Sequence, residues 1–171
     1  MVKHLTIINP ENATEDEVKG YAIREAARAI VLDIENNIAL LYAANGDYYK
    51  LPGGGIEKNE DKEAALARES LEEVGCDISI IQELGELTEY RKLFSLKQIS
   101  YCYITKAKGE KGNPTFTKEE QAEGFIVTWA PYGEAVQRIS ECNPQSLEAK
   151  LYMVPRDTCF LKEAKNLLNK I

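Results

Sequence analysis

The sequence predicts an α/β fold in which a mixed sheet lies between helices. Apolar and β-branched runs of strand length precede and follow a charged helical segment at 59–75. The predicted order is strands, helix, strands, helix, helix, which favours a sheet covered by helices. The 171 residues suit one domain over 1–171. Within it we expect an N-terminal extension at 1–20 and a C-terminal helical extension at 144–171.

Three short strands are predicted before the charged helix. A nearly continuous apolar run, residues 26–33, is typical of a strand whose two faces are both covered. Thr14 and Glu17 have the spacing of a capping box, so one or two helical turns are expected there. The three predicted strands are residues 3–8, 26–33 and 38–43, and residues 48–51 lead into a glycine-rich loop.

Three strands and two helices are predicted after the charged helix. The run at 98–106 is rich in tyrosine and β-branched residues, which favours a strand. The strand before it is long, and an interruption is expected at Gly85. Pro131 at a first-turn position begins a helix. The predicted elements are strands at 78–90, 98–106 and 125–129, and helices at 131–141 and 155–168.

Composition limits the classes of ligand and compartment. The net charge of −7 argues against binding to nucleic-acid polymers or anionic membranes, which need a basic surface. It allows a small nucleotide, because one bound cation reverses the charge locally. The four scattered cysteines and the single His4 make a zinc site improbable. Without a visible signal peptide, we expect free thiols and a cytoplasmic protein.

The charged helix has clear start and stop signals. Asn59 is the expected N-cap, and Gly75 is the expected C-cap glycine. Negative charge in the first turn agrees with the helix dipole, and is supplied by Glu60, Asp61 and Glu63. One apolar stripe is expected along the helix, formed by Ala64, Ala67, Leu71 and Val74.

Three carboxylates are predicted on the opposite face of this helix, from Glu69, Glu72 and Glu73. Like charges at such spacing destabilise an exposed helix by about 0.2–0.5 kcal/mol per pair. Oxygen ligands are what Mg²⁺ and Mn²⁺ prefer, so this arrangement indicates a hard divalent cation. We therefore expect Mg²⁺ as the cofactor, with Mn²⁺ as the alternative.

A glycine turn precedes the helix. Gly53, Gly54 and Gly55 follow Leu51-Pro52, and their backbone can approach a ligand without a Cβ in the way. Glycine-rich turns that lead into a helix commonly present peptide N–H and C=O groups to phosphate or metal. The sequence thus places a carboxylate face beside a loop suited to a phosphorylated ligand.

This stretch resembles the Nudix box, G-x5-E-x7-R-E-U-x-E-E-x-G-U, in which U is aliphatic. The glycine, glutamate and arginine positions all match, while Ser70 and Cys76 stand at two aliphatic positions. The matching residues are Gly54, Glu60, Arg68, Glu69, Glu72, Glu73 and Gly75. The resemblance implies a Nudix-type α/β/α sandwich with a mixed sheet and an appended C-terminal helix. It also implies hydrolysis of a nucleoside diphosphate linked to another moiety X.

The resemblance also implies roles for single residues. Glu69 and Glu73 resemble the principal metal ligands, Glu72 a further or water-bridged ligand, and the Gly53 carbonyl a loop ligand. Arg68 and Glu60 resemble the pair that holds helix and loop together. The general base lies outside the box in many members, and Glu123 is the predicted one. Glu119 and Glu120 are the alternatives, and all three carboxylates can also be read as solvated loop charges.

The sequence gives the least information about which residues contact the substrate. Arg28, Gly54, Gly55 and Tyr49 are the candidate substrate-binding residues, although tyrosines on strands belong more often to a core. Arg24 and Arg91 are further candidates for phosphate contact. The competing function is a Nudix-like module that senses a nucleotide without cleaving it. Retention of the box glutamates favours the enzyme.

Overall fold

The computed structural model describes residues 2–171. The helices and strands follow the predicted order, with two short elements that were not predicted, the strand β4 and the helix α3 before the last strand. The elements are β1 (His4–Ile8), α1 (Glu15–Lys19), β2 (Ala22–Leu32), β3 (Ile38–Ala43), β4 (Tyr48–Lys50), α2 (Lys62–Val74), β5 (Asp77–Arg91), β6 (Leu96–Lys108), α3 (Lys118–Ala122), β7 (Phe125–Ala130), α4 (Tyr132–Ser140) and α5 (Val154–Leu168). A 3₁₀ turn (Lys92–Phe94) separates β5 from β6, and a π-helical turn (Ala149–Met153) leads into α5.

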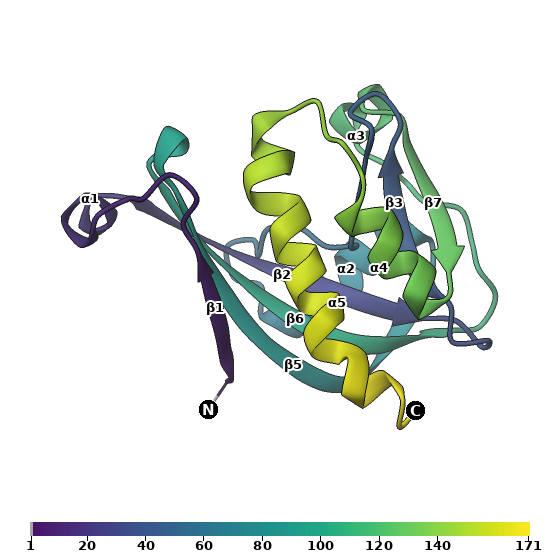
Figure 1. Ribbon diagram of the computed structural model, residues 1–171. Helices are drawn as coiled ribbons and strands as arrows, with labels where there is room; N and C mark the ends of the chain where they lie inside the picture. Colours follow the sequence, from purple (N-terminus) through teal and green to yellow (C-terminus); the bar gives the residue numbers. More distant parts are fainter. Residues whose placement is uncertain (1) are drawn as a thin grey trace.

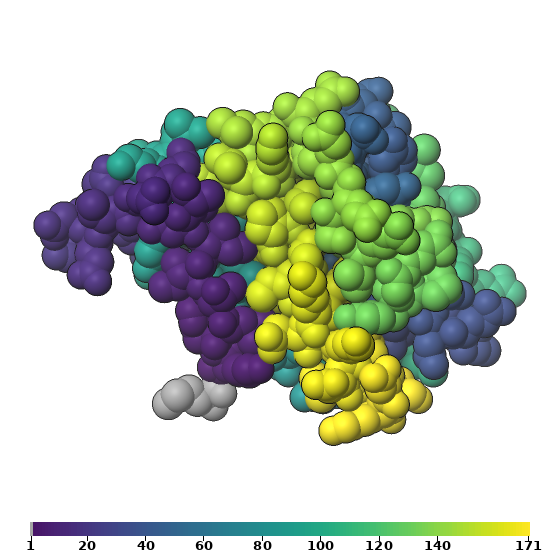
Figure 2. Space-filling model, in the orientation of Figure 1, coloured from purple at the N-terminus to yellow at the C-terminus, as the bar shows by residue number. Residues whose placement is uncertain are grey.

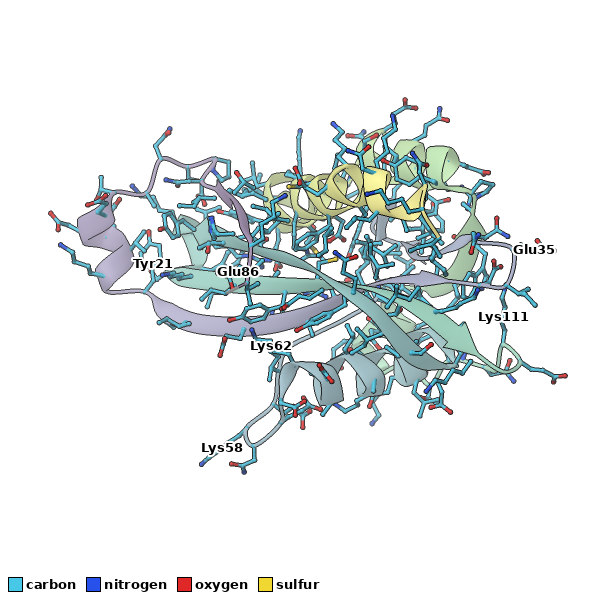
Figure 3. The ribbon with its side chains drawn as sticks, turned by 90° about the horizontal axis from the view of Figure 1, so that it is seen from below. Tyr21, Glu35, Lys58, Lys62, Glu86 and Lys111 are labelled. Carbon is cyan, nitrogen blue, oxygen red and sulfur yellow. The ribbon has the colours of Figure 1, made fainter. Side chains whose placement is uncertain are left out.

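A mixed seven-stranded sheet forms the middle layer, which confirms the predicted fold (Figure 1). Hydrogen-bonded strands follow the order β1-β5-β6-β2-β3-β4, and β7 pairs with β3. β2 runs parallel to β6 and β1 parallel to β5, while the remaining pairs are antiparallel. α2 covers one face of this sheet, and α4 and α5 cover the other (Figure 3).

Each face of the sheet has its own apolar core, because successive side chains of a strand point to opposite faces. On β2, Ile30 and Leu32 face α4 and α5, whereas Ala29 and Val31 face α2. From α5, Phe160, Leu161 and Ala164 pack into the first core, as the sequence predicts. Lys62 lies at the start of α2 against the sheet, with Nζ 3.4 Å from the ring centroid of Tyr101 (Figure 3).

The predicted apolar stripe of α2 is wrong. Leu71 is 51% exposed, whereas the buried residues of the helix are Ala65, Leu66, Glu69, Ser70, Glu73 and Val74. Two of the three carboxylates therefore lie on the inward face, where partners for their charge are available. The predicted N-cap is also wrong, since Asp61 accepts the capping hydrogen bond from Ala64 N while Asn59 adopts a positive φ of 69°.

Several other local predictions are confirmed. The capping box of Thr14 and Glu17 begins α1, and β5 has a register shift next to Gly85. β2, β5 and β6 are longer than predicted, since pairing with a neighbour extends a strand beyond its apolar run.

The N-terminal segment, drawn in purple, and α5, drawn in yellow, lie side by side on the face shown in Figure 2. Lys3 forms an ion pair of 3.0 Å with Glu163 of α5, and Tyr152 donates a hydrogen bond to Glu11. The C-terminal helix thus contacts the N-terminal segment as well as the sheet. Within residues 2–171, no helix combines the length and the apolar character needed to cross a bilayer.

We predict opposite effects for two glycine-to-alanine changes. Gly75 ends α2 with a φ of +75°, and an added Cβ would lie 2.7 Å from the carbonyl of Gly112. Gly75→Ala should therefore destabilise the fold by at least about 1–2 kcal/mol. Gly133 lies within α4, and apart from its chain neighbours and the backbone of its own helix no atom lies within 4 Å of an added Cβ, so Gly133→Ala should stabilise by about 0.5–1 kcal/mol.

Urea and thermal unfolding measure both changes. A loss of about 2–8 °C in Tm is expected for Gly75→Ala in a domain of this size. Equal stability of the two variants would show that α2 does not depend on its left-handed end.

Candidate active site

The glycine loop is held beside β2 by backbone hydrogen bonds. Ala27 N donates to the Gly54 carbonyl and Ala29 N to the Pro52 carbonyl, both at 3.0 Å. Ile56 N donates to the Glu25 carbonyl at 3.0 Å. The loop therefore continues the sheet next to the middle of β2 and is fixed there by its backbone.

Glu73 joins α2 to this loop. Its carboxylate, 1% exposed, accepts hydrogen bonds from Lys50 Nζ at 2.8 Å and from Gly53 N at 2.5 Å. Burial raises the pKa of Glu73 above its ordinary value, while Lys50 and the Gly53 amide act in the opposite direction. The helix, β4 and the loop thus meet at one buried carboxylate.

Arg68 joins α2 to the loop a second time. Its guanidinium donates two hydrogen bonds to Glu60, at 2.8 and 2.9 Å, and one to the Gly55 carbonyl at 3.1 Å. It also contacts Glu69 at 2.8 Å and Glu72 at 3.3 Å. The hydrogen bonds to Glu60 raise the pKa of Arg68. This geometry agrees with the predicted pairing of Arg68 with Glu60.

A cavity of about 260 Å³ opens between the glycine loop, α2 and the start of α5. Its wall consists almost entirely of charged side chains and glycines. The lining residues are Arg24, Arg28, Lys50, Gly53, Gly54, Gly55, Glu69, Glu73, Arg91, Glu120, Glu148, Met153 and Arg156. A wall of this composition suits a small, highly charged ligand.

The structure brings six of the predicted site residues together at this cavity. They are Arg28, Gly53, Gly54, Gly55, Glu69 and Glu73, and the further candidates Arg24 and Arg91 and the alternative base Glu120 line the cavity as well. Arg68 lies directly behind Glu69. Arg28 is buried and donates a hydrogen bond to the Gly53 carbonyl. Burial and the nearby Arg156 lower the pKa of Arg28 to about 10.

Three predicted residues lie outside the cavity. The Glu72 side chain is 41% exposed and contacts Arg68. Tyr49 stacks on Tyr42 with ring centroids 4.6 Å apart, and faces Arg138 of α4. Glu123 ends α3 and accepts a hydrogen bond from Asn45 N through its backbone, whereas the alternative Glu120 lines the cavity.

Four cavity residues were not predicted, namely Lys50, Glu148, Met153 and Arg156. Asp157, which holds Arg156, was missed as well. A signal for the last two exists in the sequence. Ala149, Tyr152, Arg156, Phe160 and Ala164 recur at steps of three or four and are fully buried, and Asp157 lies beside Arg156 and is also fully buried. Charges within an apolar stripe indicate a buried polar site.

Metal binding by side chains alone finds no support in the part of the chain that the structure describes. No three acidic, histidine or cysteine side chains of residues 2–171 lie close enough together to hold an ion. Glu69 and Glu73 each have a cationic partner instead, Arg68 and Lys50.

Comparison with known proteins identifies the family. A family model described as NUDIX domain matches residues 22–149. An RNA pyrophosphohydrolase of a Nitratiruptor species is 30% identical over 128 residues, which are 68% of this chain and 81% of that protein. An 8-oxo-dGTP diphosphatase of Proteus vulgaris is 37% identical over 57 residues, which are 31% of this chain and 51% of that protein. The chain thus spans about half of that second relative.

Solved structures share the fold. A NUDIX hydrolase from Nitrosomonas europaea superposes with a TM-score of 0.63 at 14% identity, covering 85% of this chain and 90% of that one. In this chain the mixed sheet is combined with the glycine loop and with the box residues on α2. The chain therefore belongs to the NUDIX domain family and is an enzyme of the Nudix hydrolase class.

Proposed function

We propose that this enzyme is a Mg²⁺-dependent hydrolase that cleaves the pyrophosphate bond of a nucleoside diphosphate linked to another moiety. The observation that carries the proposal is the meeting of Glu69, Glu73 and the glycine loop at one cavity with several cations in its wall. Phosphoanhydride oxygens are negative, and both metal ions and cationic side chains stabilise them during hydrolysis. Two relatives carry the names diphosphatase and pyrophosphohydrolase, which supports this reaction class.

The donor set fits a hard divalent cation. Glu69, Glu73 and the Gly53 carbonyl offer oxygen atoms, which Mg²⁺ prefers and Mn²⁺ also accepts. Mg²⁺ is commonly held by one or two carboxylates together with substrate phosphates and water. An added Cβ at Gly54 would collide with the Glu69 carboxylate, so only glycine leaves this carboxylate its place against the loop.

Each protein group has a proposed task in the reaction. A bound divalent cation would neutralise phosphate charge and lower the pKa of a water molecule. Arg68 orients Glu69, and Lys50 with the Gly53 amide orients Glu73. Arg24 and Arg28 orient the phosphate oxygens.

Glu120 accepts the proton of the attacking water. We assign this role to Glu120 rather than Glu123 because Glu120 lines the cavity. Glu72 acts through Arg68.

The cytoplasm is the proposed compartment. All four cysteines, Cys76, Cys102, Cys142 and Cys159, are free, which agrees with a reducing environment.

Metal removal tests the proposal as a whole. Incubation with a panel of nucleoside triphosphates, nucleotide sugars and dinucleoside polyphosphates should release a nucleoside monophosphate or phosphate with Mg²⁺ present. Chelation with EDTA should abolish release, and added Mg²⁺ should restore it. Nucleotide binding without any cleavage, at saturating Mg²⁺, would favour the sensing module instead.

The carboxylate of Glu73 should be essential. Glu73→Gln keeps the shape of the side chain but removes its charge, so we expect turnover to fall about a hundredfold or more. Glu63→Gln is the matched control, because Glu63 is exposed on the same helix. Circular dichroism verifies folding of both variants. Wild-type turnover in Glu73→Gln would exclude the assigned role.

The proton acceptor is tested by two neighbouring changes. Glu120→Gln should lower kcat by about 10²–10⁴-fold, as is typical for loss of general-base catalysis. Glu123→Gln should leave kcat nearly unchanged, since Glu123 lies outside the cavity. The reverse order of effects would return the role to Glu123.

A further inference from the structure

Cations are buried around the cavity to an unusual degree. Arg28, Lys50, Arg91 and Arg156 are 4%, 7%, 2% and 0% exposed, in a chain whose net charge is −7. Arginine and lysine are almost never fully buried unless a counter-charge accompanies them. The pairing of each cation therefore tells whether it serves the fold or a ligand.

Three of the four cations have a buried carboxylate partner. Lys50 lies 2.8 Å from Glu73, Arg91 lies 3.0 Å from Glu89, and Arg156 lies 2.7 Å from Asp157. Glu89 is also held by Gln98 at 2.7 Å, so it is fixed as a counter-ion behind the wall. These three pairs explain how the fold tolerates three of the four charges.

Arg28 is the exception. In residues 2–171 no carboxylate oxygen lies within 4.0 Å of its guanidinium, and its Nε has no hydrogen-bond partner. One terminal nitrogen donates to the Gly53 carbonyl, which supplies a dipole but no negative charge. An arginine guanidinium keeps its positive charge in proteins. An unpaired buried cation costs stability, so an anion entering the cavity would be its missing partner.

Two further arginines of the same wall carry spare donors. Arg156 Nη1 lies 4.0 Å from Glu89 Oε2 without a hydrogen bond. The two terminal nitrogens of Arg91 donate to Glu89 at 3.0 Å and to the cavity-lining Glu148 at 2.5 Å, and only its Nε has no partner among the described residues. Asp157 and Glu89 hold these guanidinium groups from behind. Asp157 in addition accepts a hydrogen bond of 2.9 Å from Leu51 N, directly before the glycine loop. The donors are thus fixed relative to the loop before any ligand arrives.

The rest of the wall does not suit a nucleobase. Among the described residues that line the cavity, Met153 is the one apolar side chain, and none of them is aromatic. Bases bind in proteins largely by stacking on aromatic rings and by apolar contact, which this lining offers only through Met153. Phosphoryl oxygens, in contrast, match the fork of an arginine and need no apolar surface.

We propose that Arg28, Arg91 and Arg156 form a subsite for the terminal phosphoryl group of the substrate. The preferred substrate class then ends in a free phosphate, as a nucleoside triphosphate does. A diphosphate esterified at both ends has no such dianionic group to place there. The role of this subsite in catalysis depends on the proposed hydrolase function. Arg156 lies on α5, beyond the matched residues 22–149, so this part of the subsite comes from outside the matched region.

Phosphate binding without divalent metal tests the subsite directly. Calorimetric titration with orthophosphate and tripolyphosphate should show saturable binding to the wild-type enzyme. Arg28→Gln should weaken it about tenfold or more, since hydrogen bonds to charged groups are strong. Arg138→Gln, on α4 outside the cavity, is the control and should leave binding unchanged. Unaltered phosphate binding in Arg28→Gln, or none in the wild type, would overturn the proposal.

Stability separates a binding role from a structural one. Because Arg28 has no carboxylate partner in the described chain, Arg28→Gln should keep or raise the Tm while phosphate binding falls. A large loss of Tm, or failure to fold, would assign Arg28 a structural role and contradict the subsite. Arg156→Lys is the second variant, since it keeps the charge beside Asp157 but loses the planar fork.

Substrate preference completes the test. With Mg²⁺, kcat/KM for a nucleoside triphosphate should exceed that for a nucleotide sugar of the same nucleoside. Arg28→Gln and Arg156→Lys should reduce this preference mainly by raising KM for the triphosphate. A wild-type preference for the nucleotide sugar would overturn the proposal. Phosphate binding without any hydrolysis would reject the proposed function and keep the subsite, whereas hydrolysis without phosphate binding would do the opposite.

Discussion

The buried carboxylate of Glu73 is the contact on which the arrangement of the site depends. It accepts hydrogen bonds from Lys50 Nζ and from Gly53 N, so one side chain connects α2, β4 and the glycine loop. A buried carboxylate without partners would be strongly destabilising, and this makes the alternative positions of the three elements unfavourable. With α2, β4 and the loop fixed in this way, Arg68 donates hydrogen bonds to both Glu69 and Glu60 and so ties the helix to the segment after the loop.

An acidic chain builds a cation-rich cavity by placing its counter-ions behind the wall. Glu89 and Asp157 are both fully buried, and each holds an arginine that lines the cavity. Their charges make burial of the arginines tolerable, because paired and hydrogen-bonded ions lose less on desolvation. Arg28 lacks such a partner within residues 2–171, and its burial therefore lowers the stability of the fold. Functional sites commonly carry local destabilisation of this kind.

Two parts of the chain share the site. The loop and α2 lie within the matched residues 22–149, and they bring the carboxylates and the glycines. α5 follows the matched region and brings Arg156 and Asp157 across the sheet. The π-helical turn before α5 places Met153 at the cavity, and such turns occur often at functional sites. The C-terminal helix therefore serves as the far wall of the cavity as well as a cover for the sheet.

The resemblance to the Nudix box implied the pairing of Arg68 with Glu60. The sequence by itself determined most strands and helices, the capping box of α1 and the end of α2. These features follow from periodicity and from contacts a few residues apart. It could not show that the charged face of α2 turns inward, because a row of carboxylates resembles a solvated face until its partners are known. Only the tertiary structure decided the cavity wall, where Leu51 N meets Asp157 across a separation of 106 residues. Contacts of that range leave no periodic trace, so Lys50 and Glu148 joined the site through packing alone. Arg156 left a trace only as a charge within the apolar stripe of the last helix.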